Sequence, residues 1–322
     1  MRSISRISDE DRDMAENSRK KVEIVVPSYN EEENLRPFYR EVKKTAGTLK
    51  DCEFSFLFVN DGSSDHTLEG IRELAGEDKS VKYISFSRNF GKEAAIYAGL
   101  KNSSADIVIL MDADLQHPPA LIPDMIKALN EGFGACGAKR ETGLSSRTFT
   151  RLNNMLSTVK LQRGATDYMC MSRAFVDAVM QLSESQRFSK GLFAWVGFKV
   201  KWLDYVQNPR EHGKSKWNFQ RLFSYAMDGI TGFSVVPLRI VTISGAVISL
   251  LSLIYIIITI LKVLIHGIDV PGYVTILVAI LFMGGIILLA IGLLGSYIGR
   301  VFIETKNRPI YIEEENNFDS GS

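Results

Sequence analysis

The chain has 322 residues, of which 46% are hydrophobic, and its formal net charge is +1. This length leaves room for one large or two moderate domains, and the hydrophobic fraction is ordinary for a globular protein. The nearly neutral charge argues against bulk nucleic-acid binding, which requires a basic surface. The three cysteines are widely spaced and form no paired motif, so the sequence predicts neither a disulfide framework nor a zinc site, and we expect reduced thiols.

Residues 1–20 lack the apolar core of a signal peptide, and we expect them to form a disordered tail. From Lys21 onward, short apolar runs alternate with segments of helical spacing. The strand-like runs are VEIVVP, EFSFLFVN, VKYISF and DIVILM. Strands that are almost wholly apolar predict an α/β domain with a mostly parallel sheet covered on both faces. We expect the domain to span 21–216 and the sheet to finish with a strand at 199–206.

Polar residues follow three of these strands at the point where each ends. Ligands of open α/β sheets bind beyond the carboxyl ends of the strands. The segments concerned are Pro27-Ser28-Tyr29-Asn30-Glu31, Asn60-Asp61-Gly62-Ser63-Ser64-Asp65 and Asp112-Ala113-Asp114. We therefore expect a binding site at this edge of the sheet.

Asp112 and Asp114 place two carboxylates one residue apart at a strand exit. Hard oxygen ligands suit Mg²⁺ or Mn²⁺, whose remaining positions are often filled by substrate phosphates. Such a pair is also common in solvated turns. Asp61 is expected to accept hydrogen bonds from a nucleotide or to form an Asx-type turn, and Gly62 would permit the tight turn beside it.

Two basic segments are candidates for binding phosphate. Arg88-Asn89-Phe90-Gly91-Lys92 opens a helix, so Lys92 could bring positive charge toward a phosphate, or it could form surface salt bridges. Arg210-Glu211-His212-Gly213-Lys214-Ser215-Lys216 comes just before the hydrophobic part of the chain and could meet a phosphate headgroup or anionic lipid. Gly132-Phe133-Gly134-Ala135-Cys136-Gly137 follows a predicted helix instead of preceding one, so we interpret it as a helix stop and not a dinucleotide site.

The C-terminal third is strongly hydrophobic. We expect an amphipathic helix at 217–234, which either lies on the membrane surface or packs on the domain. We further expect transmembrane helices at 235–265 and 272–300 and a cytoplasmic tail at 301–322. Lysines and arginines flank this pair of helices on the outside, whereas the connecting HGIDVPG has none. The positive-inside rule then places both termini and the predicted α/β domain in the cytoplasm.

Seven segments resemble, in order, the motifs of family 2 glycosyltransferases: VVPSYNEEENL, FVNDGSSDHT, SRNFGKEAAIYAGL, DIVILMDADLQHPP, TDYMCMSR, REHGKSKW and GSYIGRVFIETKNRPIY. The chain is most similar to the polyprenyl-phosphate glycosyltransferases, such as bactoprenol glucosyltransferases and dolichol-phosphate mannose synthases. The two-helix hairpin resembles the bacterial undecaprenyl-phosphate branch, which places the protein in the cytoplasmic membrane. The Gln-x-x-Arg-Trp motif of processive synthases is missing, because no Arg-Trp occurs in the chain.

The resemblance implies a glycosyltransferase A-type fold, a UDP- or GDP-sugar donor and a lipid phosphate acceptor. It assigns metal and diphosphate binding to Asp112 and Asp114, and an acceptor-side carboxylate, often described as the general base, to Asp167. The remaining implied contacts are to the nucleotide (Pro27, Tyr29, Glu31 and Asp61), to the donor (Gln116) and to the acceptor phosphate (Arg210, Ser215 and Lys216).

The expected reaction is a single displacement with inversion, in which the metal held by Asp112 and Asp114 stabilises the departing diphosphate. A phosphate monoester has a second pKa near ~6 and is already nucleophilic at neutral pH, so Asp167 is expected to orient the acceptor or to act as a base. Glucose is the first expectation for the sugar, before N-acetylglucosamine, mannose and galactose. The alternatives are a transferase acting on a hydroxyl group and a non-catalytic scaffold that binds nucleotide sugars. The oligomeric state stays open, and a homo-oligomer is compatible with this prediction.

Overall fold

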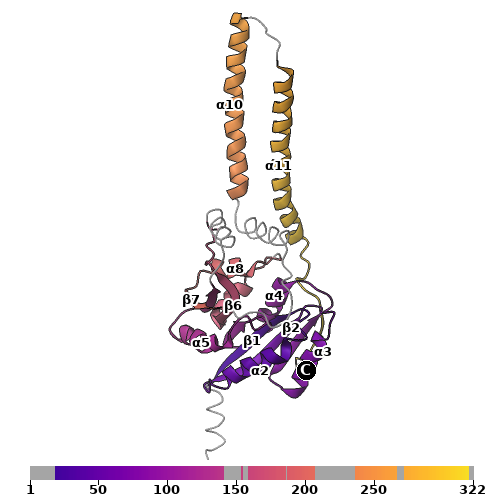
Figure 1. The fold of residues 1–322 in the computed structure, drawn as a ribbon, viewed down its shortest axis with the longest axis vertical. Helices are drawn as coiled ribbons and strands as arrows, with labels where there is room; N and C mark the ends of the chain where they lie inside the picture. Colours follow the sequence, from indigo (N-terminus) through magenta and orange to yellow (C-terminus); the bar gives the residue numbers. More distant parts are fainter. Residues whose placement is uncertain are drawn as a thin grey trace, which may run out of the picture.

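The computed structural model describes residues 19–140, 154, 159–185, 187–206, 236–266 and 272–318. Within these residues, an eight-stranded sheet carries helices on both faces, and two long helices project away from it (Figure 1). The predicted surface helix at 217–234 and the acceptor residues Arg210, Ser215 and Lys216 lie outside the described residues.

The first four strands alternate with helices, as expected from the sequence. The strands are β1 (Lys20–Ser28), β2 (Cys52–Asn60), β3 (Val81–Phe86), β4 (Ile107–Leu110), β5 (Ala135–Arg140), β6 (Ala165–Ser172), β7 (Val200–Tyr205) and β8 (Glu313–Asn316). The helices are α2 (Leu35–Ala46), α3 (Thr67–Glu77), α4 (Lys92–Asn102), the 3₁₀ turn η1 (Pro119–Leu121), α5 (Ile122–Asn130), α7 (Arg173–Met180), α8 (Ser189–Trp195), α10 (Val236–His266) and α11 (Tyr273–Thr305).

The strand order in the sheet is β7-β5-β6-β4-β1-β2-β3-β8. β1 pairs in parallel with β2 and β4, and β2 pairs in parallel with β3. The antiparallel strand β6 lies between β4 and β5, and β7 is parallel to β5. The predicted α/β architecture with a mostly parallel sheet is confirmed. The chain reverses its direction of travel across the sheet between β1 and β4, where ligands bind in such folds.

Alternate residues of the central strands supply two separate cores. In β1, Val22, Ile24 and Val26 pack on the face covered by α2, α3 and α5. Val25 lies on the opposite face, which α4, α7 and α8 cover. Successive side chains of a strand point to opposite faces, so strands buried on both faces must be apolar at nearly every position. This explains the uninterrupted apolar runs in the sequence.

The expectation that the sheet finishes with the strand at 199–206 is wrong. That segment forms β7, but the chain returns after α11 and adds β8 antiparallel to β3 at the other edge. Tyr311 lies just before β8 and stacks on Phe86, with ring centroids 4.7 Å apart. Arg72 of α3 forms a two-pronged salt bridge with Glu315, at 2.9 and 2.7 Å. The segment predicted as a tail is therefore partly an edge strand.

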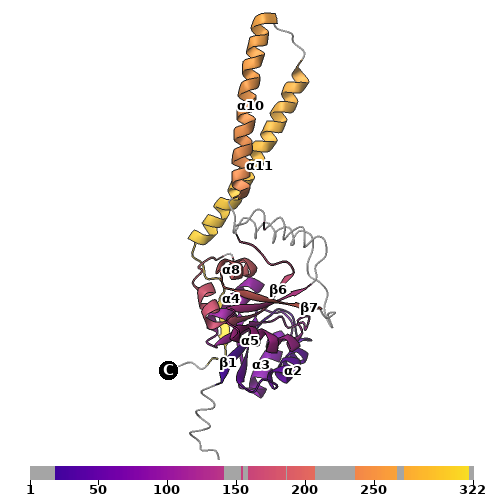
Figure 2. The ribbon, with the colours of Figure 1, turned by 90° about the vertical axis from the view of Figure 1, so that its left-hand side faces the viewer.

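Helices α10 and α11 form an antiparallel hairpin that extends from one side of the α/β domain (Figures 1 and 2). Many apolar side chains of both helices are exposed. Within the described residues, Phe282–Thr305 is long and apolar enough to cross a membrane, judged by length and composition. The Glu304 carboxylate, near the end of α11, accepts hydrogen bonds from the backbone N–H of Ser185 at 3.0 and 3.1 Å. The base of the hairpin is thus tied to the α/β domain.

Candidate active site

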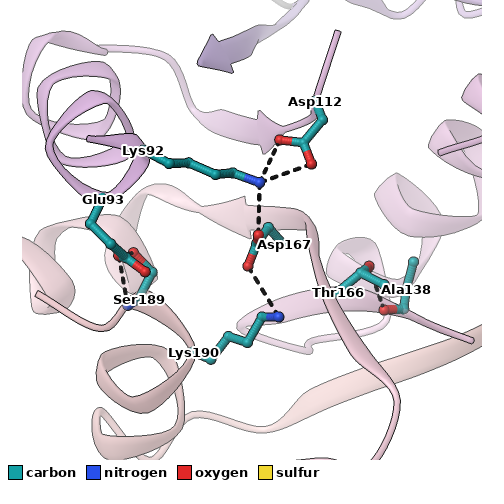
Figure 3. Close-up of polar contacts among 8 residues, drawn as sticks. All are labelled: Lys92, Glu93, Asp112, Ala138, Thr166, Asp167, Ser189 and Lys190. Atoms are coloured by element: carbon teal, nitrogen blue, oxygen red, sulfur yellow. Dashed lines mark hydrogen bonds and ion pairs between the residues drawn. The ribbon is translucent and has the colours of Figure 1, made fainter. Parts of the chain in front are cut away.

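Asp112 and Lys92 meet at the carboxyl edge of the sheet. Asp112 follows the end of β4, and Lys92 is the first residue of α4. The Lys92 ammonium lies 2.7 Å from one oxygen of the Asp112 carboxylate and 2.9 Å from the other (Figure 3). The sequence left two roles open for Lys92, phosphate binding or ion pairing, and the structure places its ammonium in ion pairs.

Asp167 brings a second carboxylate to the same lysine. Its Oδ2 accepts a hydrogen bond from Lys92 at 2.8 Å, and its Oδ1 lies 3.5 Å from the ammonium of Lys190 in α8 (Figure 3). Burial raises the pKa of Asp167, but the charges of Lys190 and Lys92 outweigh this effect and hold the pKa well below its usual range. Asp167 is therefore ionised and has a cation at each oxygen.

An irregularity in strand pairing sets the position of Asp167. The β5–β6 register shifts between the pairs Gly137–Met169 and Lys139–Ala165, and Asp167 lies in the intervening part of β6. The hydroxyl of Thr166 donates a hydrogen bond to the Ala138 carbonyl oxygen at 2.9 Å, which anchors this stretch (Figure 3). Bulges of this kind redirect side chains and are frequent beside active sites.

A hydrogen-bonded contact joins the first turns of α4 and α8. Glu93 accepts a hydrogen bond from the backbone N–H of Ser189 at 2.9 Å and another from the Ser189 hydroxyl (Figure 3). Burial raises the pKa of Glu93, while the bonds from Ser189 act in the opposite direction. Lys92 and Lys190 are the neighbours of these two residues in the sequence, so the contact holds both lysines near Asp167.

Asp61 organises the loop between β3 and α4. Its carboxylate accepts hydrogen bonds from the N–H groups of Phe90 at 2.7 Å and Gly91 at 3.0 Å, and from the Asn89 amide at 3.0 Å. Burial raises the pKa of Asp61, and the backbone bonds partly offset this rise. Asp61 thus holds the loop that leads into Lys92. The nucleotide contact expected for Asp61 stays a prediction.

Gly62 allows this loop to approach closely. Its φ is +62°, a left-handed conformation that favours glycine. A Cβ atom at this position would lie 2.3 Å from the Arg88 carbonyl carbon. Gly62 is therefore required both by the turn, as expected from the sequence, and by the backbone packed against it.

The loops after β1 and β2 are linked by hydrogen bonds. The N–H of Asn30 donates to the Ser63 hydroxyl at 3.1 Å, and the N–H of Glu31 donates to the Thr67 hydroxyl at 2.8 Å. Pro27 lies in β1, opposite Val59, and the side chain of Tyr29 is partly exposed at the rim. These links hold the predicted nucleotide-binding residues on one preformed edge of the domain.

Asp114 and Gln116 belong to a tight turn after Asp112. The N–H of Gln116 donates to the Asp114 carboxylate at 3.2 Å, and the intervening Leu115 has a φ of +54°. His117 follows and packs its ring against Tyr168 of β6, with centroids 5.1 Å apart. Desolvation lowers the pKa of His117, which favours its neutral form. The packed rings of His117 and Tyr168 thus support the turn that contains Asp114 and Gln116.

Among the predicted site residues, the structure brings Asp112, Lys92 and Asp167 into direct contact, with Asp114 and Gln116 in the adjoining turn. The prediction did not include Lys190, Glu93 and Ser189. Glu93 lies inside a quoted motif, but its contact with Ser189 spans 96 positions of the chain. No local pattern could have revealed this contact.

Asp112 and Asp114, which follow β4, are the residues predicted to hold a divalent cation. The Asp112 carboxylate already holds a cation, the Lys92 ammonium, with both of its oxygens. Within the described part of the chain, no group of three or more His, Cys, Asp or Glu side chains could hold a metal by itself. A cation bound here would need further ligands from the substrate, as Mg²⁺ commonly does with phosphates.

Residues 23–179 match the glycosyl transferase family 2 profile, and residues 236–301 match the GtrB C-terminal hairpin. The chain is 46% identical over 303 residues to the putative glycosyltransferase CsbB of Bacillus subtilis, covering 92% of each chain. It is 42% identical over 300 residues to the bactoprenol glucosyl transferase of Shigella phage SfV, covering 91% of this chain and 97% of the relative. A solved mannosyltransferase from Pyrobaculum calidifontis aligns with a TM-score of 0.46 and 14% identity, over 66% of this chain and 62% of that one.

The relatives align with this chain over more than nine tenths of its length, so the resemblance extends beyond the motifs to nearly the whole sequence. The observed sheet topology and the family match agree with the expected glycosyltransferase A-type fold, and the hairpin match supports association with a membrane. With the carboxylates after β4 and in β6 at one edge of a mostly parallel sheet, the chain belongs to the family 2 glycosyltransferases and is a glycosyltransferase.

Proposed function

We propose that this enzyme transfers glucose from UDP-glucose to a polyprenyl phosphate, with inversion at the anomeric carbon. The observation that carries the proposal is the meeting of Asp112 and Asp167 around Lys92 at the carboxyl edge of the sheet. The relatives named bactoprenol glucosyl transferase, at 41–42% identity over more than nine tenths of this chain, support both the sugar and the acceptor.

We assign the donor side of the site to the residues after β1, β2 and β4. Pro27 lies near the end of β1, and Tyr29, Glu31 and Asp61 lie in the linked loops that follow β1 and β2. Asp112 and Asp114 would hold Mg²⁺ or Mn²⁺ there, with Gln116 in the same turn. When bound, the cation would offset negative charge on the departing diphosphate. Lys92 would add a fixed positive charge on the same side.

The acceptor phosphate is itself the nucleophile in this proposal. A phosphate monoester is largely dianionic at neutral pH and needs no proton removed before it attacks. Lysines contact both oxygens of Asp167 and hold its pKa well below the usual range, so it is a weak base, which favours an orienting role. Arg210, Ser215 and Lys216 remain the proposed partners of the acceptor phosphate.

For the membrane arrangement, we propose that α10 and α11 cross the bacterial cytoplasmic membrane as a hairpin, with the catalytic domain and both termini on the cytoplasmic side. At about 1.5 Å per residue, each helix is longer than the ~30 Å hydrocarbon layer. The basic residues Arg300, Lys306 and Arg308 lie near the domain end of α11, whereas the connecting turn has no lysine or arginine. This arrangement would place the site at the membrane surface.

The proposal is tested with the full-length protein in detergent, supplied with radiolabelled UDP-glucose, undecaprenyl phosphate and Mg²⁺ or Mn²⁺. We expect label to enter a lipid product that releases glucose in mild acid, as a sugar phosphodiester does. UDP-N-acetylglucosamine, UDP-galactose and GDP-mannose in parallel reactions test the choice of sugar.

Each part of the proposal has its own contrary result. An acid-stable lipid product would indicate a hydroxyl acceptor, and tight donor binding without turnover would indicate a non-catalytic scaffold. Full activity in the presence of a chelator would overturn the metal assignment. Asp167→Asn separates the remaining roles, because a modest loss of rate is expected for an orienting group, whereas a loss of several decades would identify a base.

A further inference from the structure

The contact between Ser189 and Glu93 positions Lys190, which has no role in the reaction proposed above. Ser189, at the start of α8, is only 3% exposed, and both its N–H and its hydroxyl donate to Glu93 of α4. This contact fixes the direction in which α8 leaves the site. The next side chain, Lys190, consequently lies beside Asp167 (Figure 3).

The ammonium of Lys190 has capacity for another partner. Its distance to Asp167 is 3.5 Å, longer than the 2.8 Å from Lys92 to the other oxygen of the same carboxylate. The Lys190 side chain is 30% exposed, so an anion can reach it. An ammonium group donates three hydrogen bonds. Within the described residues, Asp167 is its one recorded ion-pair partner.

Helix α8 lies on the side of the catalytic domain that faces the hairpin, in both views (Figures 1 and 2). Ser185, shortly before α8, is hydrogen-bonded to Glu304 at the end of α11. Trp195, the last residue of α8, is 59% exposed. Tryptophan is enriched at membrane–water interfaces. A lipid headgroup that approaches along the hairpin would therefore reach the Lys190 side of Asp167, whereas Asp112 lies on the other side, beyond Lys92 (Figure 3).

We propose that Lys190 binds the phosphate of the membrane-borne acceptor, with Glu93 and Ser189 as positioning residues. This inference rests on the proposed function and adds residues to the acceptor side of that site. Lys190 would bind the phosphate oxygens, and the Asp167 carboxylate would lie between Lys190 and Lys92. The negatively charged oxygens of the acceptor phosphate would then lie between Lys190, on the acceptor side, and the donor site beyond Lys92.

The test measures initial rates of full-length Lys190→Gln in detergent, with each substrate varied separately. We expect the KM for undecaprenyl phosphate to rise roughly tenfold, because a hydrogen bond to a charged group is lost. The KM for UDP-glucose should change less than about twofold. A short-chain prenyl phosphate that stays in solution should show the same rise, which separates headgroup binding from partition into micelles.

The exposed Lys199, further along the same segment, provides a matched control. Lys199→Gln removes the same charge and should leave both KM values unchanged. An unchanged acceptor KM in Lys190→Gln would overturn the inference, as would a rise confined to the KM for UDP-glucose. If the wild-type enzyme transfers no sugar to any prenyl phosphate, the proposed function fails, and this inference fails with it.

Variants of Glu93 test the positioning role. Glu93→Ala removes the acceptor of both Ser189 bonds and should raise the acceptor KM in the same direction as Lys190→Gln. Glu93→Gln retains a side-chain oxygen and should restore most of the wild-type value. In the double variant Glu93→Ala/Lys190→Gln the two increases should not add, because both act through the same ammonium. Additive effects, or a loss of kcat alone, would contradict this role.

Discussion

The catalytic domain and the hairpin use apolar residues in opposite ways. In the sheet, Val108 of β4 is fully buried between helices, whereas Ile291 of α11 is 58% exposed. The sheet carries its own helical cover on both faces, and its polar groups gather at one edge. The two hairpin helices have many exposed apolar side chains. The comparison indicates that the domain completes its own core and that the hairpin requires an apolar environment.

The same substitution in each region tests this contrast most strongly. Val108→Asp would bury a carboxylate without a partner and should cost more than about 4 kcal/mol, enough to prevent folding of the domain. Ile291→Asp should leave the thermal unfolding of the catalytic domain unchanged but weaken retention in membranes, at about 3 kcal/mol for a charge at the centre of a span. Unfolding in detergent and extraction with alkaline carbonate measure the two effects. If Ile291→Asp unfolds the domain, the hairpin belongs to the protein core.

Asp112→Asn tests whether a change in the catalytic domain can abolish the reaction without affecting folding or membrane anchoring. We expect the rate to fall roughly a thousandfold, because the carboxylate that meets Lys92 loses its charge. Thermal unfolding and membrane retention should stay at wild-type values. The exposed Asp124 of α5 provides a control, since Asp124→Asn makes the same chemical change away from the site. Comparable rates for the two variants would contradict the assignment of Asp112.

Gly62→Ala examines how rigid the polar edge of the domain is. The added methyl group would collide with the backbone at Arg88 and would occupy a left-handed conformation, so we expect a loss of about 1–3 kcal/mol in stability. The donor KM should also rise, because Asp61 and its loop shift. Gly76→Ala in α3 is the matched control, since a Cβ there meets no atom within 4 Å. Denaturant unfolding should separate the two variants.

Tyr311→Ala probes the connection between the two regions. Tyr311 stacks on Phe86 and accepts a hydrogen bond from the Asn102 amide at 3.1 Å, so its loss should cost about 1–2 kcal/mol and loosen β8. Hydrogen exchange of the β3 and β8 amides measures this effect directly. Ile312→Ala, at the exposed neighbour, should have little influence. Unchanged exchange in Tyr311→Ala would show that β8 is held by its backbone pairing alone.

Much of the catalytic domain could be predicted because its signals are local. The runs from Val22 to Val26 and from Ile107 to Leu110 are apolar at almost every position, which identifies buried parallel strands. Asp61 and Asp112 lie just after β2 and β4, so parallel pairing with β1 places both at the same edge of the sheet. The family motifs, the helix stop at Gly132 and the hairpin likewise lie within short segments of the chain.

The sequence by itself therefore determined the fold class, the family and the edge of the sheet where chemistry takes place. Only the tertiary structure decided that Lys92 pairs with Asp112 and Asp167, that Glu93 holds Ser189, and that the chain returns after α11 to form β8. The Lys92–Asp167 contact joins positions 75 residues apart, and the β8 contacts join positions more than 200 apart. Periodicity and spacing report neighbours along the chain, whereas these contacts depend on how whole elements pack against one another.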